Sequence, residues 1–154
     1  MSTRRRAREV AMQALYQYDL NRDTTSEDTE RFIRDRLRYA GLEDYCLGLV
    51  AGVLGKSEAL RAAISQAAAH WSIERMAPID RNILRLAVYE LTHAEAPMKV
   101  AINEAIEMCK RFSTTESAAF VNGILDTIGK TAESAHEPAP EPEAAELTNT
   151  TQSE

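Results

Sequence analysis

The sequence predicts an all-α protein, built as a compact bundle of six or seven helices. Apolar residues recur at helical spacing in nearly every segment that carries enough large side chains to form a core. No segment alternates apolar and polar residues between turn-forming residues, as a half-buried strand would. No unit of about 20–50 residues repeats, which argues against a solenoid. The length of 154 residues suits one domain of ordinary size.

Three helices are predicted in the first half of the chain. The first covers about residues 4–20 and the second about 26–40, where Gly41 is a typical C-terminal stop. A longer third helix is predicted over about residues 43–69. Its glycines, Gly48, Gly52 and Gly55, fall on one side of that helix, and each costs about 1 kcal/mol relative to alanine. We therefore expect this side to lie close against another helix.

Three further helices are predicted in the second half. One begins at Pro78, a favoured residue for a first helical turn, and carries the segment IDRNILRLAVYEL. The next follows Pro97 and carries KVAINEAIEMCKRF. The segment from Ser113 to Glu116 has the S-x-x-E form of a capping box, which predicts a last helix that ends near residue 128 with Gly129 as its stop.

Acidic residues are concentrated at the C-terminal end. The chain has 24 acidic and 18 basic side chains, and residues 131–154 hold six glutamates and no Lys or Arg. Residues 1–130 are therefore neutral. The acidic segment also holds three of the five prolines and few large apolar side chains, so it cannot bury enough surface to offset the entropy of ordering. We expect a helical domain over residues 1–130 and a disordered tail over residues 131–154.

Nothing in the chain predicts a membrane segment, a secretion signal or a disulfide. No apolar run approaches the roughly 18 residues of a membrane span, and polar residues interrupt the helix that follows the basic N-terminus. Cys46 and Cys109 lie far apart and form no CxxC pair, so we expect two buried thiols. These observations predict a cytoplasmic protein.

Sequence motifs of catalysis are absent. The three histidines are scattered, and the chain carries no H-E-x-x-H, phosphate-binding loop, dinucleotide fingerprint or G-x-S-x-G. We therefore expect neither an enzyme nor a bound metal or cofactor.

The densest positive charge lies at the beginning of the first helix, where Arg4, Arg5, Arg6 and Arg8 crowd together. Positive charge at a helix N-terminus is unfavourable, by about 0.3–1 kcal/mol for each exposed charge. Tyr16 falls on the same outward side as Arg5 and Arg6. The pattern favours a bound polyanion such as nucleic acid, although it also fits a helix end that is simply solvated.

Phe120 lies at the edge of the core stripe of the last predicted helix, beside small and polar residues that include Gly123. A ring flank exposed next to a glycine can receive an unstacked base, and such stacking is worth roughly 1–3 kcal/mol. Burial of Phe120 beneath a neighbouring helix fits the same periodicity equally well.

Charged residues on the two preceding helices allow further expectations. Glu90 falls on or beside the apolar side of its helix and is expected to form a structural ion pair, whereas Asp80 in the first turn could face a partner. Lys99 is again a cation at a helix start, and Glu107 with Arg111 has the spacing of an ordinary i,i+4 pair. On the helix that begins at Pro78, the side expected to face outward carries Arg81, Asn82, Arg85 and Tyr89.

The chain resembles the NusB family of bacterial transcription antitermination factors. The resemblance is carried by RRRARE and AMQALYQYDL within residues 4–20, Trp71 followed by IERMAPIDRNILRLAVYEL, KVAINEAIEMCKRF, and FVNGILD over residues 120–126, all in the family's order. It implies an all-α fold of two packed three-helix subbundles. It also implies binding to the boxA element of single-stranded leader RNA together with NusE, a small-subunit ribosomal protein. The pair would join other Nus factors on RNA polymerase and suppress premature termination, notably in ribosomal RNA operons.

The same resemblance implies which residues contact these partners. Asp80 matches a position on the NusE side, and homodimers that hide the RNA surface are possible in the family. We expect the arginine cluster and Phe120 to converge on one path for an unpaired RNA strand. The RNA contacts implied are Arg4, Arg5, Arg6, Arg8, Tyr16, Lys99, Glu116, Phe120 and Asn122.

Two other functions fit parts of the pattern. The chain could be a protein-only helical scaffold in a transcription or ribosome-assembly complex, with the arginines facing an acidic partner. It could also be an RNA-targeting domain related to those of ribosomal RNA methyltransferases, which would need a separate cofactor domain.

Overall fold

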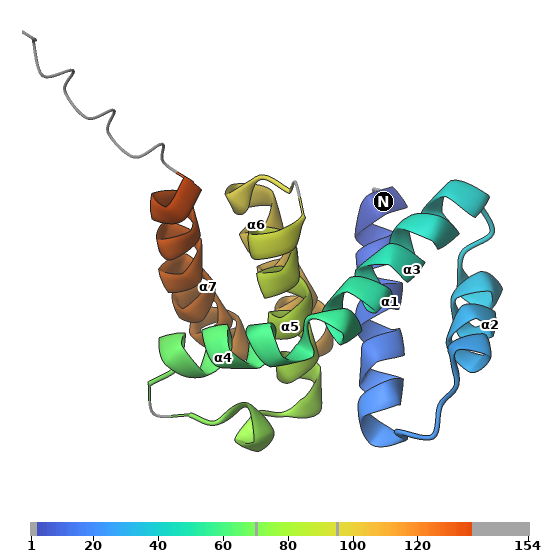
Figure 1. Ribbon diagram of the computed structural model, residues 1–154, viewed down its shortest axis with the longest axis horizontal. Helices are drawn as coiled ribbons and strands as arrows, with labels where there is room; N and C mark the ends of the chain where they lie inside the picture. The colour runs from blue at the N-terminus through green and yellow to red at the C-terminus, as the bar shows by residue number, and fades with distance from the viewer. Residues whose placement is uncertain (1–2, 70, 95, 137–154) are drawn as a thin grey trace, which may run out of the picture.

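The computed structural model describes residues 3–69, 71–94 and 96–136, and in these ranges it contains seven α-helices, one short 3-10 helix and no strand (Figure 1). The all-α prediction is confirmed. The elements are α1 (Thr3–Leu20), α2 (Ser26–Arg36), α3 (Ala40–Gly55), α4 (Ser57–Ala67), η1 (Ile73–Arg75), α5 (Pro78–His93), α6 (Met98–Phe112) and α7 (Thr115–His136).

The helices form two packed subbundles. Helices α1, α2 and α3 pack together, and α4, α5, α6 and α7 form the second group, with α1 and α3 lying against α5 between them (Figure 1). The second group has four helices because the long helix predicted over residues 43–69 is broken. The break falls at Lys56, whose backbone N–H bonds to the carbonyls of Gly52 and Val53. Helix α4 thereby turns away to pack on α5 and α7.

Two glycines that were predicted to stop helices lie inside helices in the structure. Thr25 and Asp28 form a capping box at the start of α2, and Gly41 lies inside the first turn of α3 rather than stopping α2. Helix α7 continues through Gly129 to His136. The methyl carbon of Met98 lies 2.6 Å from the place where a Cβ of residue 129 would be, so this glycine permits contact between α6 and α7.

The glycine side of the predicted third helix is a close helix contact at one position. The ring of Tyr89 on α5 occupies the space that a Cβ at Gly52 would fill. Gly48 and Gly55 have no atom within 4 Å of such a Cβ, so the prediction of close approach is wrong for them.

Helix α5 is the most deeply packed helix, and its expected outward side is largely covered. Asn82 is 1% exposed, and Arg81 donates from Nε to Oδ2 of Asp19 at 2.7 Å. Arg85 lies 3.5 Å from the same carboxylate oxygen. Burial by itself would raise the pKa of Asp19, but the bond from Arg81 and the charge of Arg85 hold that pKa below its ordinary value. Nδ2 of Asn82 also donates to Oδ2 of Asp19 at 3.3 Å, so three groups of α5 hold the end of α1.

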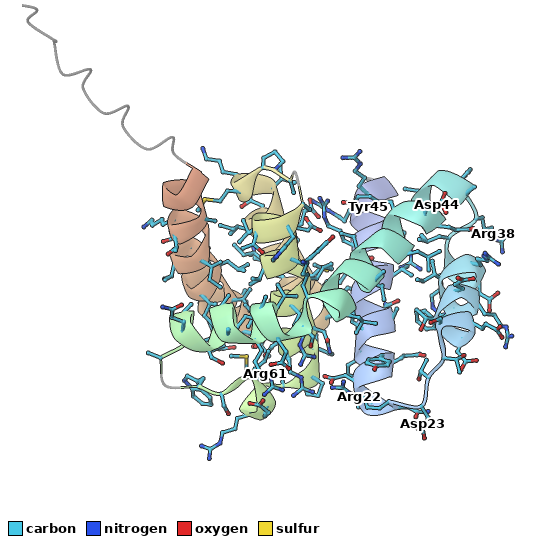
Figure 2. All side chains as sticks on the ribbon, in the orientation of Figure 1. Arg22, Asp23, Arg38, Asp44, Tyr45 and Arg61 are labelled. Atoms are coloured by element: carbon cyan, nitrogen blue, oxygen red, sulfur yellow. The ribbon has the colours of Figure 1, made fainter. Side chains whose placement is uncertain are left out.

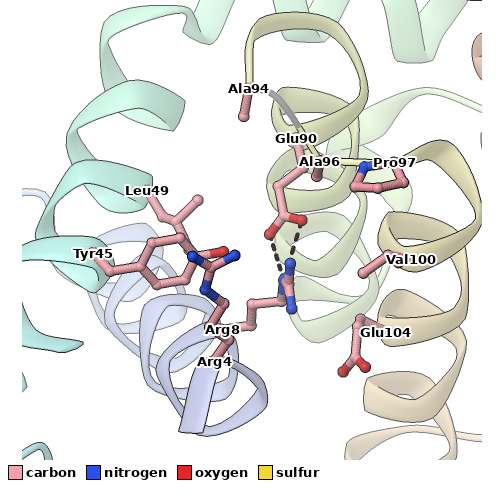
Figure 3. Close-up of a pocket in the computed structure, with 10 residues that line it drawn as sticks. All are labelled: Arg4, Arg8, Tyr45, Leu49, Glu90, Ala94, Ala96, Pro97, Val100 and Glu104. Carbon is pink, nitrogen blue, oxygen red and sulfur yellow. Dashed lines mark hydrogen bonds and ion pairs between the residues drawn. The ribbon is translucent and has the colours of Figure 1, made fainter. Parts of the chain in front are cut away.

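The interface between the subbundles contains a buried ion pair. Nε of Arg8 on α1 lies 2.8 Å and 3.1 Å from the two carboxylate oxygens of Glu90 on α5, as the dashed lines in Figure 3 mark. Burial disfavours both charges. It raises the pKa of Glu90, which Arg8 offsets only in part, while Glu90 raises the pKa of Arg8 despite the burial. The prediction that Glu90 forms a structural pair is confirmed.

The remaining expectations concern the cysteines, the membrane and the tail. Cys46 and Cys109 are buried and unbonded, and burial raises the pKa of each thiol to about 12. None of the helices in the described ranges combines the length and apolarity that a membrane crossing requires. Residues 131–136, predicted as the start of the tail, belong to α7, and the rest of the predicted tail lies outside the described residues.

We predict that Arg8→Met destabilises the protein by about 3–5 kcal/mol, because it leaves the Glu90 carboxylate buried without its partner. Urea unfolding followed by circular dichroism measures this loss. The double variant Arg8→Met with Glu90→Leu should recover most of it, since two apolar side chains of similar size can replace a buried pair. A loss below about 1 kcal/mol in the single variant would contradict a structural role.

We further predict a pH-dependent contribution from Asp19. Its native pKa is depressed, so its stabilisation is present above the unfolded value and is lost as the pH falls through the native value. Asp19→Asn should therefore cost about 3 kcal/mol at pH 7 and less at pH 3, which lies below the ordinary pKa of the carboxyl. Urea unfolding at the two pH values tests this, with Asp23→Asn in the exposed α1–α2 loop as a control that shows no such difference.

Candidate nucleic-acid interface

Carboxylates of α1, α5 and α6 pair with three of the four arginines of the cluster. Arg5 donates from Nε and Nη2 to the carboxylate of Glu104 at 2.9 Å and 3.1 Å, and this bond raises the pKa of Arg5. Arg6 lies 3.5 Å from Glu9. Both arginine side chains are still about two-fifths exposed, so an added anion can reach them.

Arg8 does not belong to this exposed group. It is 6% exposed and its guanidinium is bonded to Glu90, so the prediction that Arg8 contacts RNA is corrected to a role in the core. The helix-dipole argument missed this because it weighed the arginines only against their own helix. The opposing negative charge comes from Glu90 and Glu104, which are distant in the sequence.

Arg4 is the most exposed member of the cluster. Its guanidinium lies 5.4 Å from the centre of the Tyr45 ring, and Figure 2 shows Tyr45 of α3 beside the beginning of α1. Both residues line a cleft of about 530 Å³ between the subbundles, together with Glu90, Val100 and other residues of α5 and α6 (Figure 3). The charges inside this cleft are mostly paired, which leaves Arg4 as the group available to a phosphate.

Phe120 lines a second, smaller cavity. Its ring is half-buried and packs against the core. The two predictions for Phe120, an exposed ring flank and burial beneath a neighbouring helix, are therefore each partly right. The cavity measures about 270 Å³, and its walls come from η1 and the residues on either side of it, from α5 and from α7. Its lining residues are Trp71, Arg75, Met76, Ala77, Asp80, Glu116, Ser117 and Phe120.

Asp80 holds this cavity together. It is 8% exposed, and its two carboxylate oxygens accept hydrogen bonds from Ser113 Oγ at 2.7 Å and Ser117 Oγ at 2.8 Å. Ser113 is therefore not the cap of α7. Thr114 takes that role, since its Oγ1 accepts from the backbone N–H of Ser117 at 3.0 Å. The structure places Asp80 beside Phe120 in one cavity, and not on a separate surface.

The other predicted contacts are accessible. Lys99 in the first turn of α6, Glu116 in the first turn of α7 and Asn122 are exposed, and Tyr16 on α1 is half-exposed. The expected pair between Glu107 and Arg111 is wrong, because Arg111 bonds instead to Glu9 on α1 at 2.8 Å.

The arginine cluster and Phe120 do not share one cavity. In Figure 1, α1 begins at the upper edge of the view, whereas α7 ends there and begins lower down. Helix α6, about 22 Å long for 15 residues, connects the two regions. Arg5 contacts this helix at Glu104, and Glu9 contacts it at Arg111. Ser113, which donates to Asp80, comes directly after the helix ends. Arg5 thus contacts the middle of α6 and the cavity of Phe120 lies at its C-terminal end, so the two regions are distinct, and their convergence on one strand path stays a prediction.

Two side chains of these cavities were absent from the predicted contacts. Trp71 supported only the family resemblance, and Tyr45 gave no signal of its own. A tryptophan bordered by Ala69, Ser72 and Glu74, outside every strong helical stripe, is the pattern that could have marked an exposed ring. Within the ranges described, no cluster of three or more metal-ligating side chains is formed.

Comparison with known proteins identifies the family. The NusB family model matches residues 5–130. The transcription antitermination protein NusB of Bdellovibrio bacteriovorus is 43% identical over 137 residues, covering 84% of this chain and 97% of that protein. NusB of Anaeromyxobacter dehalogenans is 44% identical over 131 residues, covering 82% and 90%.

Solved structures show the same fold. A NusB structure from T. maritima superimposes with a TM-score of 0.75 at 37% identity and covers 91% of this chain and 95% of its own. A chain from a crystal structure of antitermination factors NusB and NusE in complex with dsRNA superimposes with a TM-score of 0.77 at 26% identity, covering 85% and 98%. From its sequence and its fold alike, the chain belongs to the NusB family of transcription antitermination proteins.

Proposed function

We propose that this chain binds boxA-type single-stranded RNA together with NusE, and that the pair joins other Nus factors on RNA polymerase during antitermination in ribosomal RNA operons. The observation that carries the proposal is the cavity of Phe120, in which aromatic rings stand half-open to solvent beside exposed charged side chains. The complex of NusB and NusE with RNA among the solved relatives supports the same partners.

The two regions would perform different tasks. Arg4, Arg5 and Arg6, with Lys99, would neutralise phosphates and release counterions, which gives affinity without sequence preference. Phe120 would contact an unstacked base. The further contacts proposed for the bases and the strand are Tyr16, Glu116 and Asn122.

The solved relative contains double-stranded RNA. For this chain we favour a single strand, because an aromatic cavity can stack only a base whose faces are free. The wide, shallow minor groove of an RNA duplex offers 2′-hydroxyl groups and base edges, and the backbone offers phosphates, but the duplex exposes no such face.

A second protein fits the limited size of this surface. Most of the arginine charge is already matched by Glu9, Glu90 and Glu104, so the attraction for RNA is modest. NusE would add the missing surface. Asp80 would contribute on the NusE side of the protein by holding the turn between α6 and α7 in place. A homodimer is not part of this proposal, and the function is placed in residues 1–130, with the acidic tail as an appendage.

We predict a log–log salt dependence of RNA binding with a slope of about −2.8, the value for four single-strand phosphates neutralised by Arg4, Arg5, Arg6 and Lys99. Fluorescence anisotropy of a labelled boxA RNA at several salt concentrations measures it. The double variant Arg5→Ala with Arg6→Ala should reduce the slope by about 1.4 and weaken binding, while the helical circular-dichroism signal persists. Arg31→Ala, an exposed arginine on α2, is the matched control and should change neither. A flat salt response would contradict the proposal.

We also predict cooperative assembly. Saturating NusE should tighten boxA RNA binding by about 5- to 150-fold, and RNA should tighten NusE binding by the same factor. Calorimetric titration in both orders tests this, with scrambled and double-stranded RNA as controls. If NusE binds with equal affinity in the presence and absence of RNA, and RNA does not bind, the protein-only scaffold is the better description.

A further inference from the structure

We propose that Trp71 is a second stacking surface for RNA, which holds one unpaired base in the cavity beside Phe120. This inference rests on the function proposed above. It adds a binding residue and a defined subsite to that function.

The exposure of Trp71 has no explanation within the fold. The side chain is 57% exposed, although its neighbours along the chain, Ala68, Ile73 and Met76, are buried in the core. The segment itself is well held, since the backbone N–H of Trp71 donates to the carbonyl of Ala68 at 2.8 Å. The chain therefore keeps its single tryptophan at the surface on an anchored segment. An indole in this position is suited to contact a ligand.

The two aromatic rings of the cavity form a fixed pair. The ring centres of Trp71 and Phe120 lie 6.2 Å apart, and their planes meet at 73°. In this edge-to-face arrangement the two rings restrain each other's orientation, so little side-chain freedom remains to be lost on binding. Two rings near a right angle cannot sandwich a flat ligand. One base would instead stack on one ring and place its edge against the other.

The size and lining of the cavity also suit one base. Its volume of about 270 Å³ falls just below the range of about 300–1,000 Å³ for sites that hold drug-sized ligands. Met76 and Ala77 supply apolar lining, and exposed Arg75 at the same cavity supplies a cation for a flanking phosphate. Both carboxylate oxygens of Asp80 are taken by serines. Stacking would therefore dominate recognition here, and stacking tolerates different bases.

An RNA base fits this cavity better than a side chain of a protein partner. The cavity shares Phe120 with the proposed RNA surface, and α6 connects it with the arginine cluster at the other end of that surface. A strand that contacts Arg5 can continue along α6 to the cavity. A side chain of NusE is the competing occupant, and the experiment distinguishes the two.

The test uses the intrinsic fluorescence of Trp71, the only tryptophan of the chain. Titration of the full-length protein with unlabelled boxA RNA should change the tryptophan emission with the same midpoint that anisotropy gives for binding. Trp71→Ala should weaken RNA binding by about 5- to 150-fold, the range spanned by one base stacked on one aromatic ring. Trp71→Phe should retain most of the affinity. Tyr39→Ala, which removes a ring 71% exposed at the start of α3, is the matched control.

The outcomes separate this inference from the proposed function. If RNA binds with the expected salt dependence but the emission stays constant and Trp71→Ala binds normally, the subsite is wrong while the proposed function stands. If NusE alone changes the emission and RNA does not, a protein side chain occupies the cavity and the inference is overturned. If no RNA binds under any condition, both fail. Urea unfolding of each variant checks that it is folded under the binding conditions. The emission titration uses the wild-type protein, so its result does not depend on how any variant folds.

Discussion

The buried ion pair between Arg8 and Glu90 is the constraint on which the rest of the structure depends. It joins α1 of the first subbundle to α5 of the second, in an interior where either charge alone would be costly. The partly exposed pairs of Arg5 with Glu104 and of Arg111 with Glu9 extend the same seam along α6. Buried charges must meet their partners with good geometry, so this seam sets how the two subbundles sit against each other.

The seam also determines what the basic helix start can offer to a ligand. A row of arginines at a helix N-terminus suggests a strongly attractive surface for a polyanion. In the folded protein, carboxylates from the same helix and from α5 and α6 take up most of that charge. The surface that remains is exposed but weakly positive. A weak electrostatic surface is consistent with a protein that gains affinity and specificity from a second protein and from base contacts.

The aromatic cavity depends on a different set of interactions. Trp71 comes from the segment before η1, Asp80 from α5 and Phe120 from α7, so three elements must be placed correctly before the cavity exists. The bonds from Ser113 and Ser117 to Asp80 tie the turn between α6 and α7 to the beginning of α5. The sequence suggests Asp80 as a partner contact. In the structure, this buried carboxylate holds the neighbouring elements in place.

The sequence by itself determined the helical class, nearly all helix positions, the buried cysteines and the structural nature of Glu90. These follow from local rules, since helical period and burial are written in neighbouring residues. Only the tertiary structure decided that Arg8 is interior, that Arg111 pairs with Glu9 rather than Glu107, that α7 runs through Gly129, and that Trp71 meets Phe120. Each of these depends on a partner distant in the sequence. Helical period indicates which side of a helix is apolar, but not which side chain of another helix will lie opposite it.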